Sequence, residues 1–434
     1  MFAVQETGMR TVDAAGLEIG DEHPPRIMGV LNVSKESPYD PSVFDDPGEA
    51  AEYVDRELVD EGADIVDVGL ESANKRFEVL SAEEELERLD TAVETIESVS
   101  GDAVFSIETR YHEVADAALS RGFDMVNDIC GFADPEMPRV CADYDVAVAK
   151  MASPPDLTRP GAVESVDWAA RGDADRERSR SYADDVYDAL SLNGFTDKTI
   201  VDPAFGGWSE EKSLEDDRET FRRLREFRGL GYPILVSINR KNFLREIAGR
   251  STEAALPVSL AATSMAVERG ARIVRTHDVE ETRDAALVGY EFARSRIREA
   301  VHDSEGGGVA VEELDVTTPR EAERHLDRVG AESPSEAAKS AVVRAFELSG
   351  LSDPAVGRLS TAATDAGVTV VSDPAAVAGA ATDGGEHGST SDAAGRSVLL
   401  FGTPAAYESL EARVREFDGD GGLRAALELT STAD

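Results

Sequence analysis

From Arg26 to about Arg298, short apolar runs rich in valine and isoleucine alternate along the chain with longer segments of helical periodicity. Continuous apolar runs, in place of strict alternation between apolar and polar residues, are typical of parallel strands buried on both faces. The pattern predicts eight strands, at residues 27–33, 64–69, 104–108, 125–129, 146–151, 199–202, 234–238 and 272–277.

The segments between these strands predict helices at residues 48–61, 82–99, 113–121, 179–192, 216–228 and 257–269. Gly62, Gly122 and Gly270 stand just before the next strand, where glycine suits the left-handed residue that stops a helix. Eight strand–helix units over about 270 residues match the size of one (β/α)8 TIM barrel. Counting alone leaves a doubly wound open sheet as the alternative fold.

The rest of the chain divides around this barrel. Residues 1–25 predict an N-terminal hairpin or cap, and the barrel domain follows at residues 26–297. The glycines at 306–308 predict a linker over residues 298–308. Residues 309–434 predict a smaller α/β accessory domain with a strand at 397–401, a helix at 404–416 and no evident chemistry. The expected fold class is thus α/β, a TIM barrel followed by this C-terminal domain.

The net charge of the chain limits the kinds of molecule that it can bind. The chain has 87 acidic and 44 basic residues, a formal charge of -43, which argues against nucleic acid or anionic membranes as partners. Lysine occurs at only seven positions, and an acidic, lysine-poor surface resembles the cytosolic proteins of salt-accumulating halophiles, the alternative being a generic acidic protein. The two cysteines, Cys130 and Cys141, fit no disulfide framework. We expect a soluble, cytoplasmic protein from a halophilic archaeon.

Polar residues gather where the predicted strands end, which is where a TIM barrel builds its active site. They are Asn32, Glu108, Asn127, Asp128, Asp202, Asn239, Arg240, Lys241, Arg275 and His277. Carboxylates and carboxamides suit a heterocycle with alternating donors and acceptors, whereas lysine, arginine and histidine suit an anion such as diphosphate. Any one of these residues could equally be a solvated residue at a loop end. The convergence of the whole set on one rim favours a ligand site.

The order of motifs resembles dihydropteroate synthase throughout about the first 295 residues. The matching stretches are IMGVLNV (27–33), GADIVDVG (62–69) followed by Glu71 and Ser72, NDICG (127–131), DPEM (134–137), VDP (201–203), GYPILV (231–236), Arg240-Lys241 and ERGARIVRTHDV (268–279). Each motif alone is a weak signal, whereas their order and spacing together are specific.

The resemblance implies roles for the matched residues. Asn32 matches an asparagine that helps to hold a magnesium–diphosphate group, so Mg²⁺ is the implied cofactor. Glu108 stands where the family usually has an aspartate that reaches the pterin. Asn127 and Asp202 match pterin-binding residues, and Met151 matches a methionine that lines the pterin pocket.

The resemblance also implies the catalytic group. Lys241 matches the lysine that reaches the pterin, and Arg275 and His277 match the pair that stacks on the pterin and holds the diphosphate. The implied reaction is displacement of diphosphate from a pterin methyl carbon by an aromatic amine, p-aminobenzoate in this family, and cationic groups stabilise the leaving charge. A homodimer is implied as well, because dimers are common in the family.

Several loops depart from the family pattern, mostly those that shape the aminobenzoate half of the site. The changed stretches are residues 34–41, 73–76 and 204–209, with Asn239 for a serine and Lys150 for a histidine. Two explanations remain open: rebuilt loops that still use p-aminobenzoate, or a synthase for another arylamine or a pterin-binding protein with another role. Residues after about 309 resemble, more loosely, an accessory domain of some dihydropteroate synthases, through Leu351-Ser352, Gly367 and LLFGT at 399–403.

Overall fold

The computed structural model describes residues 9–33, 42–71, 79–154, 156–158, 181–206, 212–296, 298–302, 308–372, 396–415 and 421–432. The chain forms two compact units, Met1–Leu314 and Asp315–Asp434. The predicted linker at 298–308 is wrong in its described part, because β11 (Arg298–His302) pairs antiparallel with β12 (Gly308–Glu312). The boundary between the units therefore follows this hairpin.

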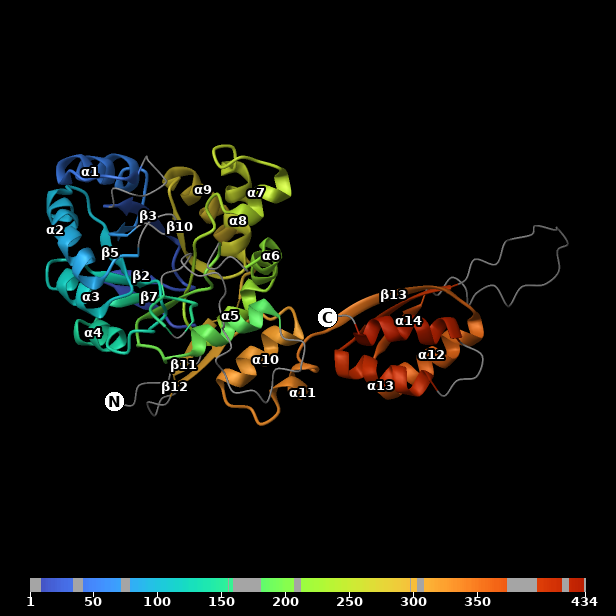
Figure 1. The fold of residues 1–434 in the computed structure, drawn as a ribbon. Coiled ribbons are helices and arrows are strands. Elements are labelled where there is room, and N and C mark those ends of the chain that lie inside the picture. The colour runs from blue at the N-terminus through green and yellow to red at the C-terminus, as the bar shows by residue number, and fades with distance from the viewer. Residues whose placement is uncertain are drawn as a thin grey trace, which may run out of the picture. The chain divides into compact units, whose positions relative to one another are not determined.

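The first unit is built on a closed barrel of eight parallel strands (Figure 1). They are β3 (Arg26–Asn32), β4 (Ile65–Gly69), β5 (Val104–Thr109), β6 (Met125–Asp128), β7 (Ala147–Met151), β8 (Thr199–Asp202), β9 (Ile234–Val236) and β10 (Ala271–Thr276). Pairing of β10 with β3 closes the barrel and rules out the open sheet. All eight predicted strands are confirmed within two residues at each end.

Nine α-helices in the described part of the first unit accompany these strands. They are α1 (Pro47–Tyr53), α2 (Ala82–Ser98), α3 (His112–Leu119), α4 (Met137–Asp143), α5 (Tyr182–Ser191), α6 (Leu214–Arg222), α7 (Asn242–Ala248), α8 (Leu256–Glu268) and α9 (Val279–Glu291). Capping boxes start α2 at Ser81 and α6 at Ser213, where a serine and the acidic residue three positions later satisfy each other's backbone N–H groups.

Two predicted helices change type before they end. The helix expected at 48–61 continues from α1 as a π-helix at Val54–Val59, and the one expected at 216–228 becomes a 3-10 helix at Leu224–Leu230. Gly62, Gly122 and Gly270 all have positive φ, as predicted. At Gly270 a Cβ would lie 2.8 Å from Arg228 Nη1, so glycine is also needed there for space.

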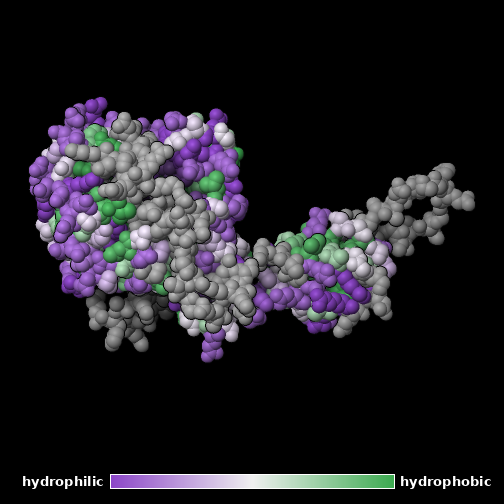
Figure 2. All heavy atoms as spheres, in the orientation of Figure 1, coloured by the Kyte–Doolittle hydropathy of each residue, from purple (hydrophilic) through white to green (hydrophobic). Residues whose placement is uncertain are grey.

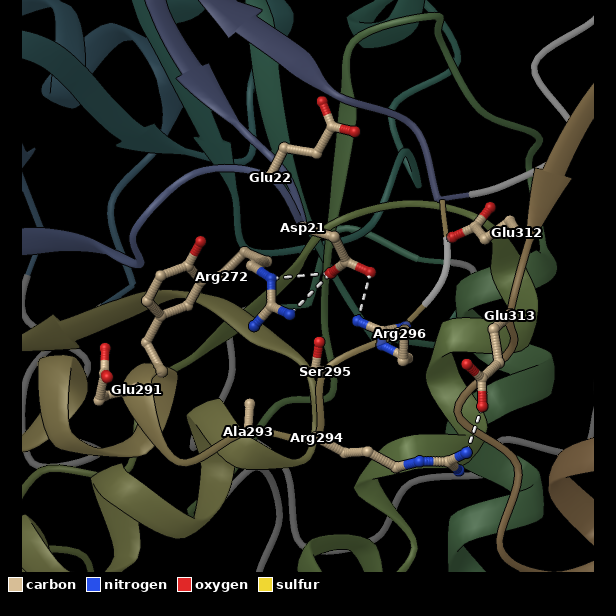
Figure 3. Close-up of a pocket in the computed structure, with 11 residues that line it drawn as sticks. Asp21, Glu22, Arg272, Glu291, Ala293, Arg294, Ser295, Arg296, Glu312 and Glu313 are labelled. Atoms are coloured by element: carbon tan, nitrogen blue, oxygen red, sulfur yellow. Dashed lines mark hydrogen bonds and ion pairs between the residues drawn. The ribbon is translucent and has the colours of Figure 1, made fainter. Parts of the chain in front are cut away.

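The amino-terminal end of the barrel is closed by a hairpin, β1 (Val12–Ala14) with β2 (Leu17–Ile19). Its apolar side chains join one cluster with the barrel interior, which contains Met28, Ile65, Val104, Met125, Ala147, Ala149, Ile200, Leu235 and Ile273. Just after the hairpin, Asp21 accepts hydrogen bonds from Arg272 and Arg296 beside a cavity of about 360 Å³ (Figure 3). Arg228 also donates to Asp21.

The second unit contains a three-stranded antiparallel sheet in the order β13 (Arg344–Leu351), β15 (Arg396–Gly402), β14 (Thr369–Ser372). Its core joins this sheet to α12 (Asp353–Ala366), α13 (Pro404–Val414) and α14 (Gly421–Thr432). Two further helices, α10 (Pro319–Arg328) and α11 (Pro334–Ala338), precede β13. The strand expected at 397–401 and the helix expected at 404–416 correspond to β15 and α13, and residue 416 lies outside the described residues.

Hydrophilic residues dominate the described surface on the face shown in Figure 2, as the acidic composition leads one to expect. In the described ranges, no helix is both long enough and apolar enough to cross a membrane.

Candidate active site

Polar side chains continue the barrel interior above its apolar layer, because side chains two positions apart in a strand face the same side. Ile65, Val104, Met125 and Ile273 lie in the interior apolar cluster, and Asp67, Ser106, Asn127 and Arg275 follow them by two positions. Asp67 is fully buried and accepts hydrogen bonds from Ser106 Oγ at 2.8 Å, Asn127 Nδ2 at 2.8 Å and Arg275 Nε at 2.7 Å. One carboxylate thus joins side chains from three other strands.

Glu108 is the second carboxylate on Arg275. Arg275 Nη2 donates to Glu108 Oε2 at 2.6 Å, so the guanidinium lies between Asp67 and Glu108. Burial raises the pKa of Glu108 to about 7, although the Arg275 charge opposes this shift. The same two carboxylates hold the pKa of Arg275 above its ordinary value, so the guanidinium stays charged.

Asp202 and Lys241 lie on the β8–β9 side of the site. The backbone N–H of Ala204 donates to Asp202 Oδ1 at 2.8 Å, and burial raises the pKa of Asp202 to about 6. Lys241 lies against Gly206, where a Cβ would stand 3.0 Å from Lys241 Nζ. Burial and the charge of Arg275 lower the Lys241 pKa. In the described part of the chain, Lys241 Nζ makes no hydrogen bond or ion pair, which leaves it available to a ligand.

The other predicted site residues end their strands on the same rim. Asn32 Nδ2 donates to Ser42 Oγ at 3.0 Å, and Asn32 Oδ1 faces Gly69, where a Cβ would be 3.3 Å away. Met151 pairs with Asp202 at the ends of β7 and β8 and is half-buried. Burial, and then the nearby Arg275 charge, lower the His277 pKa to about 3, so its imidazole is neutral near pH 7.

Arg240 and Asp128 lie at or near strand ends, but their side chains do not face the barrel mouth as their positions suggested. Arg240 binds Asp278 through Nε and Nη2, both at 2.7 Å, and its Nη1 donates to the Thr252 and Glu253 carbonyls. Asp128 accepts from the Cys130 and Phe132 backbone N–H groups. The expectation that these two side chains would face a ligand is wrong. Arg240 links its loop to Asp278 and to residues 252–253, and Asp128 anchors the loop that follows it.

Lys150, in place of the family's histidine, is also structural. It is completely buried, and Nζ donates to the backbone carbonyls of Leu190, Leu192 and Gly194 at the end of α5. The ammonium therefore satisfies carbonyls in the last turn of α5 and just beyond it, as cations near helix C-termini do.

Buried ion pairs behind the rim were not predicted from the sequence. Arg110 is fully buried, is bonded to Glu71 and donates to the Leu80 carbonyl at 2.6 Å. Lys212 Nζ lies 2.6 Å from Asp217 and donates to the Ala204 carbonyl at 2.7 Å. These pairs anchor described residues next to residues 72–78 and 207–211. Most of the altered stretches, 34–41, 73–76 and 207–209, lie outside the described residues.

The comparisons with known proteins agree with this geometry. The model of the family described as pterin binding enzyme matches residues 28–277. A Haloferax volcanii protein described as a probable bifunctional folylpolyglutamate synthase/dihydropteroate synthase is 35% identical over 59% of this chain, but the match spans only 29% of that relative. Dihydropteroate synthase of Bacillus subtilis is 30% identical over 59% of this chain and 84% of its own length.

A solved structure, dihydropteroate synthase from Thermus thermophilus in complex with 4-aminobenzoate, is similar with a TM-score of 0.51 and 29% identity. The similarity covers 65% of this chain and all of that one. The family match includes every predicted site residue, from Asn32 to His277. The chain belongs to the pterin-binding enzyme family.

Proposed function

We propose that this protein is a dihydropteroate synthase, which joins 6-hydroxymethyl-7,8-dihydropterin diphosphate to p-aminobenzoate. The observation that carries the proposal is the set of Arg275, Asn127, Asp202 and Lys241 around one barrel mouth, with Arg275 fixed between two carboxylates. Membership of the pterin-binding family and the Bacillus subtilis relative support it.

In this proposal the pterin lies over the polar layer of the barrel. Asp202 and Glu108 accept hydrogen bonds from pterin N–H groups, and Asn127 presents its amide oxygen to another such donor. Arg275 stacks on the ring, and Met151 lines the pocket. Lys241 contacts the pterin from the β9 side, where its ammonium faces Gly206.

The reaction breaks one C–O bond and forms one C–N bond. The amine nitrogen attacks the pterin methylene, diphosphate leaves with the bonding electrons, and the amine loses a proton. Charge on the departing oxygens is stabilised by Arg275 and by a hydrogen bond from the neutral imidazole of His277. No covalent enzyme intermediate is needed.

Mg²⁺ fits the chemistry of Asn32, whose carboxamide oxygen is a hard ligand on the rim next to Gly69. A single protein ligand is appropriate, because Mg²⁺ usually takes its other ligands from water and substrate phosphates. When bound, the ion would neutralise diphosphate charge. The relative from Haloferax volcanii and the charge of -43 support a halophilic archaeal source and a cytoplasm of high salt.

A homodimer formed through α8 and α9 is part of the proposal. In a chain with 30% charged residues, α8 carries no charge before Glu268. Met265 of α8 and Leu287 and Val288 of α9 are exposed, as is Phe292 just after α9. The uncharged length of α8 suits contact between two strongly acidic copies, whereas α9 also exposes Asp284 and Glu291. Light scattering on the purified protein in molar KCl measures the assembly.

The test of the function is diphosphate release in molar KCl with Mg²⁺ and the pterin diphosphate. We expect release to accelerate when p-aminobenzoate is added, with dihydropteroate formed in equal amount. Release that requires a different arylamine would move the activity to another pathway. Tight pterin binding without release under any amine would contradict the synthase and favour a pterin-binding protein. The altered arene-side stretches make this second candidate worth testing.

A further inference from the structure

Asp67 is unusual because it is a charged residue inside the packed barrel. Its exposed fraction is 0%. TIM-barrel interiors are normally filled by bulky branched side chains. A buried ion pair is seldom more stabilising than apolar residues of similar volume, because both charges lose their hydration. Stability alone therefore does not explain why a carboxylate stands at position 67. The contacts of Asp67 suggest a different reason.

The contacts of Asp67 orient two residues of the proposed pterin site. A carboxylate can only accept hydrogen bonds, so Asn127 must turn its Nδ2 toward Asp67 and its Oδ1 the other way. Arg275 is held by Nε on Asp67 and by Nη2 on Glu108, which fixes the plane of the guanidinium. Among the described residues, neither Asn127 Oδ1 nor Arg275 Nη1 has a hydrogen-bond partner.

We infer that Asp67 is the positioning residue of the pterin site: it aims the Asn127 amide oxygen and the Arg275 guanidinium at the ligand without touching it. Ser106 completes the arrangement by donating to the other oxygen of Asp67. The inference rests on the proposed function. Because Asp67 binds Asn127 Nδ2, the Asn127 amide oxygen faces the ligand and accepts hydrogen bonds from pterin N–H groups. The amine substrate is not recognised through this group.

The test compares Asp67→Asn with Asp64→Asn, two substitutions at the same strand region. Asp64 lies at the opposite end of β4, where it accepts from the Ile27 backbone N–H at 2.9 Å. An asparagine at 67 can donate, so it releases Asn127 and Arg275 from their single orientations. We expect the Kd for the pterin diphosphate, measured by calorimetry in molar KCl, to rise at least tenfold in Asp67→Asn. Asp64→Asn should stay within threefold of the parent protein.

Steady-state kinetics separate positioning from a general loss of structure. The KM for the arylamine should be unchanged in Asp67→Asn, while kcat/KM for the pterin diphosphate falls. In an Arg275→Met background, Asp67→Asn should raise the Kd for the pterin diphosphate by a smaller factor, because part of its effect acts through Arg275. An equal fall in kcat/KM for the pterin diphosphate and for the arylamine would overturn the inference. So would a Kd for the pterin diphosphate within threefold of the parent protein.

Two other results remain informative. If Asp67→Asn does not fold, Ser106→Ala removes one hydrogen bond to Asp67 and keeps its charge; we expect a two- to fivefold rise in the pterin Kd, and no rise would overturn the inference. If the parent protein itself fails to bind the pterin diphosphate, the proposed function fails first and the role of Asp67 falls with it. Normal binding by the parent and by Asp67→Asn contradicts only the inference.

Discussion

Lys241 is the residue whose loss should affect catalysis most directly, because its ammonium lies beside Gly206 with no partner among the described residues. We expect Lys241→Ala to lower turnover at least tenfold, about 1.4 kcal/mol of transition-state stabilisation. Lys198→Ala is the matched control. Lys198 lies just before β8, at the opposite end of the barrel from the site, and its Nζ donates to the Asp145 carbonyl. Near-normal turnover of folded Lys241→Ala would remove this lysine from the site.

We expect Asp202 to make pterin binding depend on pH. Burial raises its pKa to about 6, and the carboxylate accepts from pterin N–H groups only when ionised. Protonation of Asp202 alone should therefore weaken binding about tenfold for each pH unit below about 6. Glu108, with a pKa of about 7, adds a second step of the same sign, whereas His277 stays neutral and Arg275 charged over this range.

Calorimetry between pH 5 and pH 8 measures this dependence on the intact protein. Asp202→Asn should bind more weakly and lose the step near pH 6. A parent affinity that does not change across this range would contradict the ionised-carboxylate model.

For single residues, the sequence predicted site residues from their positions at strand ends. It misjudged Arg240 and Asp128, because a position at a strand end does not show which groups the side chain bonds. Arg240 and Asp128 carry the expected chemistry, but Asp278 and two backbone N–H groups engage them. Asp67 was overlooked because its neighbours in the strand are apolar and only the inward direction of its side chain reveals a partner in Arg275.

Among elements, the long continuous strands were predicted well because burial on both faces leaves a clear apolar run. Short helices such as α4 and α7 were missed, since seven residues carry less than two full turns of periodicity. The hairpin of β11 and β12 was mistaken for a linker because the glycines at 306–308 stand at and just before the start of its second strand. Glycine runs serve turns as well as linkers, and pairing partners decide between them.

Asp21 connects four elements at the base of the barrel. It follows β2 and pairs with Arg272 of β10 and Arg296 of the segment after α9 (Figure 3). It also pairs with Arg228 of the 3-10 helix after α6. Asp21→Asn should destabilise the barrel by about 3–5 kcal/mol, because it leaves two nearly buried arginines, Arg228 and Arg272, without their counter-charge. Urea unfolding measures this, and Glu18→Gln on the same hairpin should change stability by less than about 0.5 kcal/mol. If the two variants unfold with equal free energy, Asp21 is not the counter-charge that stabilises Arg228 and Arg272, and the prediction is wrong.

Over the whole molecule, the formal charge of -43 sets the response to salt. In dilute buffer the acidic residues repel one another, and near molar salt the Debye length shrinks to about 3 Å. We expect the melting temperature to rise markedly from dilute buffer to molar KCl. A melting temperature that stays the same would defeat the halophilic interpretation. Sucrose at equal osmolality is the control, because it leaves charges unscreened.

The division into two units predicts which truncation preserves the site. Every predicted site residue precedes β11, so the second unit supplies none of them. A chain ending at Leu314 keeps the β11–β12 hairpin and the Arg294–Glu313 ion pair, whereas one ending at Gly308 removes most of β12 and leaves β11 with unpaired backbone groups. We expect the longer fragment to bind the pterin diphosphate with the affinity of the full chain, and the shorter one to aggregate more readily. If the fragment ending at Leu314 folds by circular dichroism and cannot bind, the second unit must contribute to the site after all.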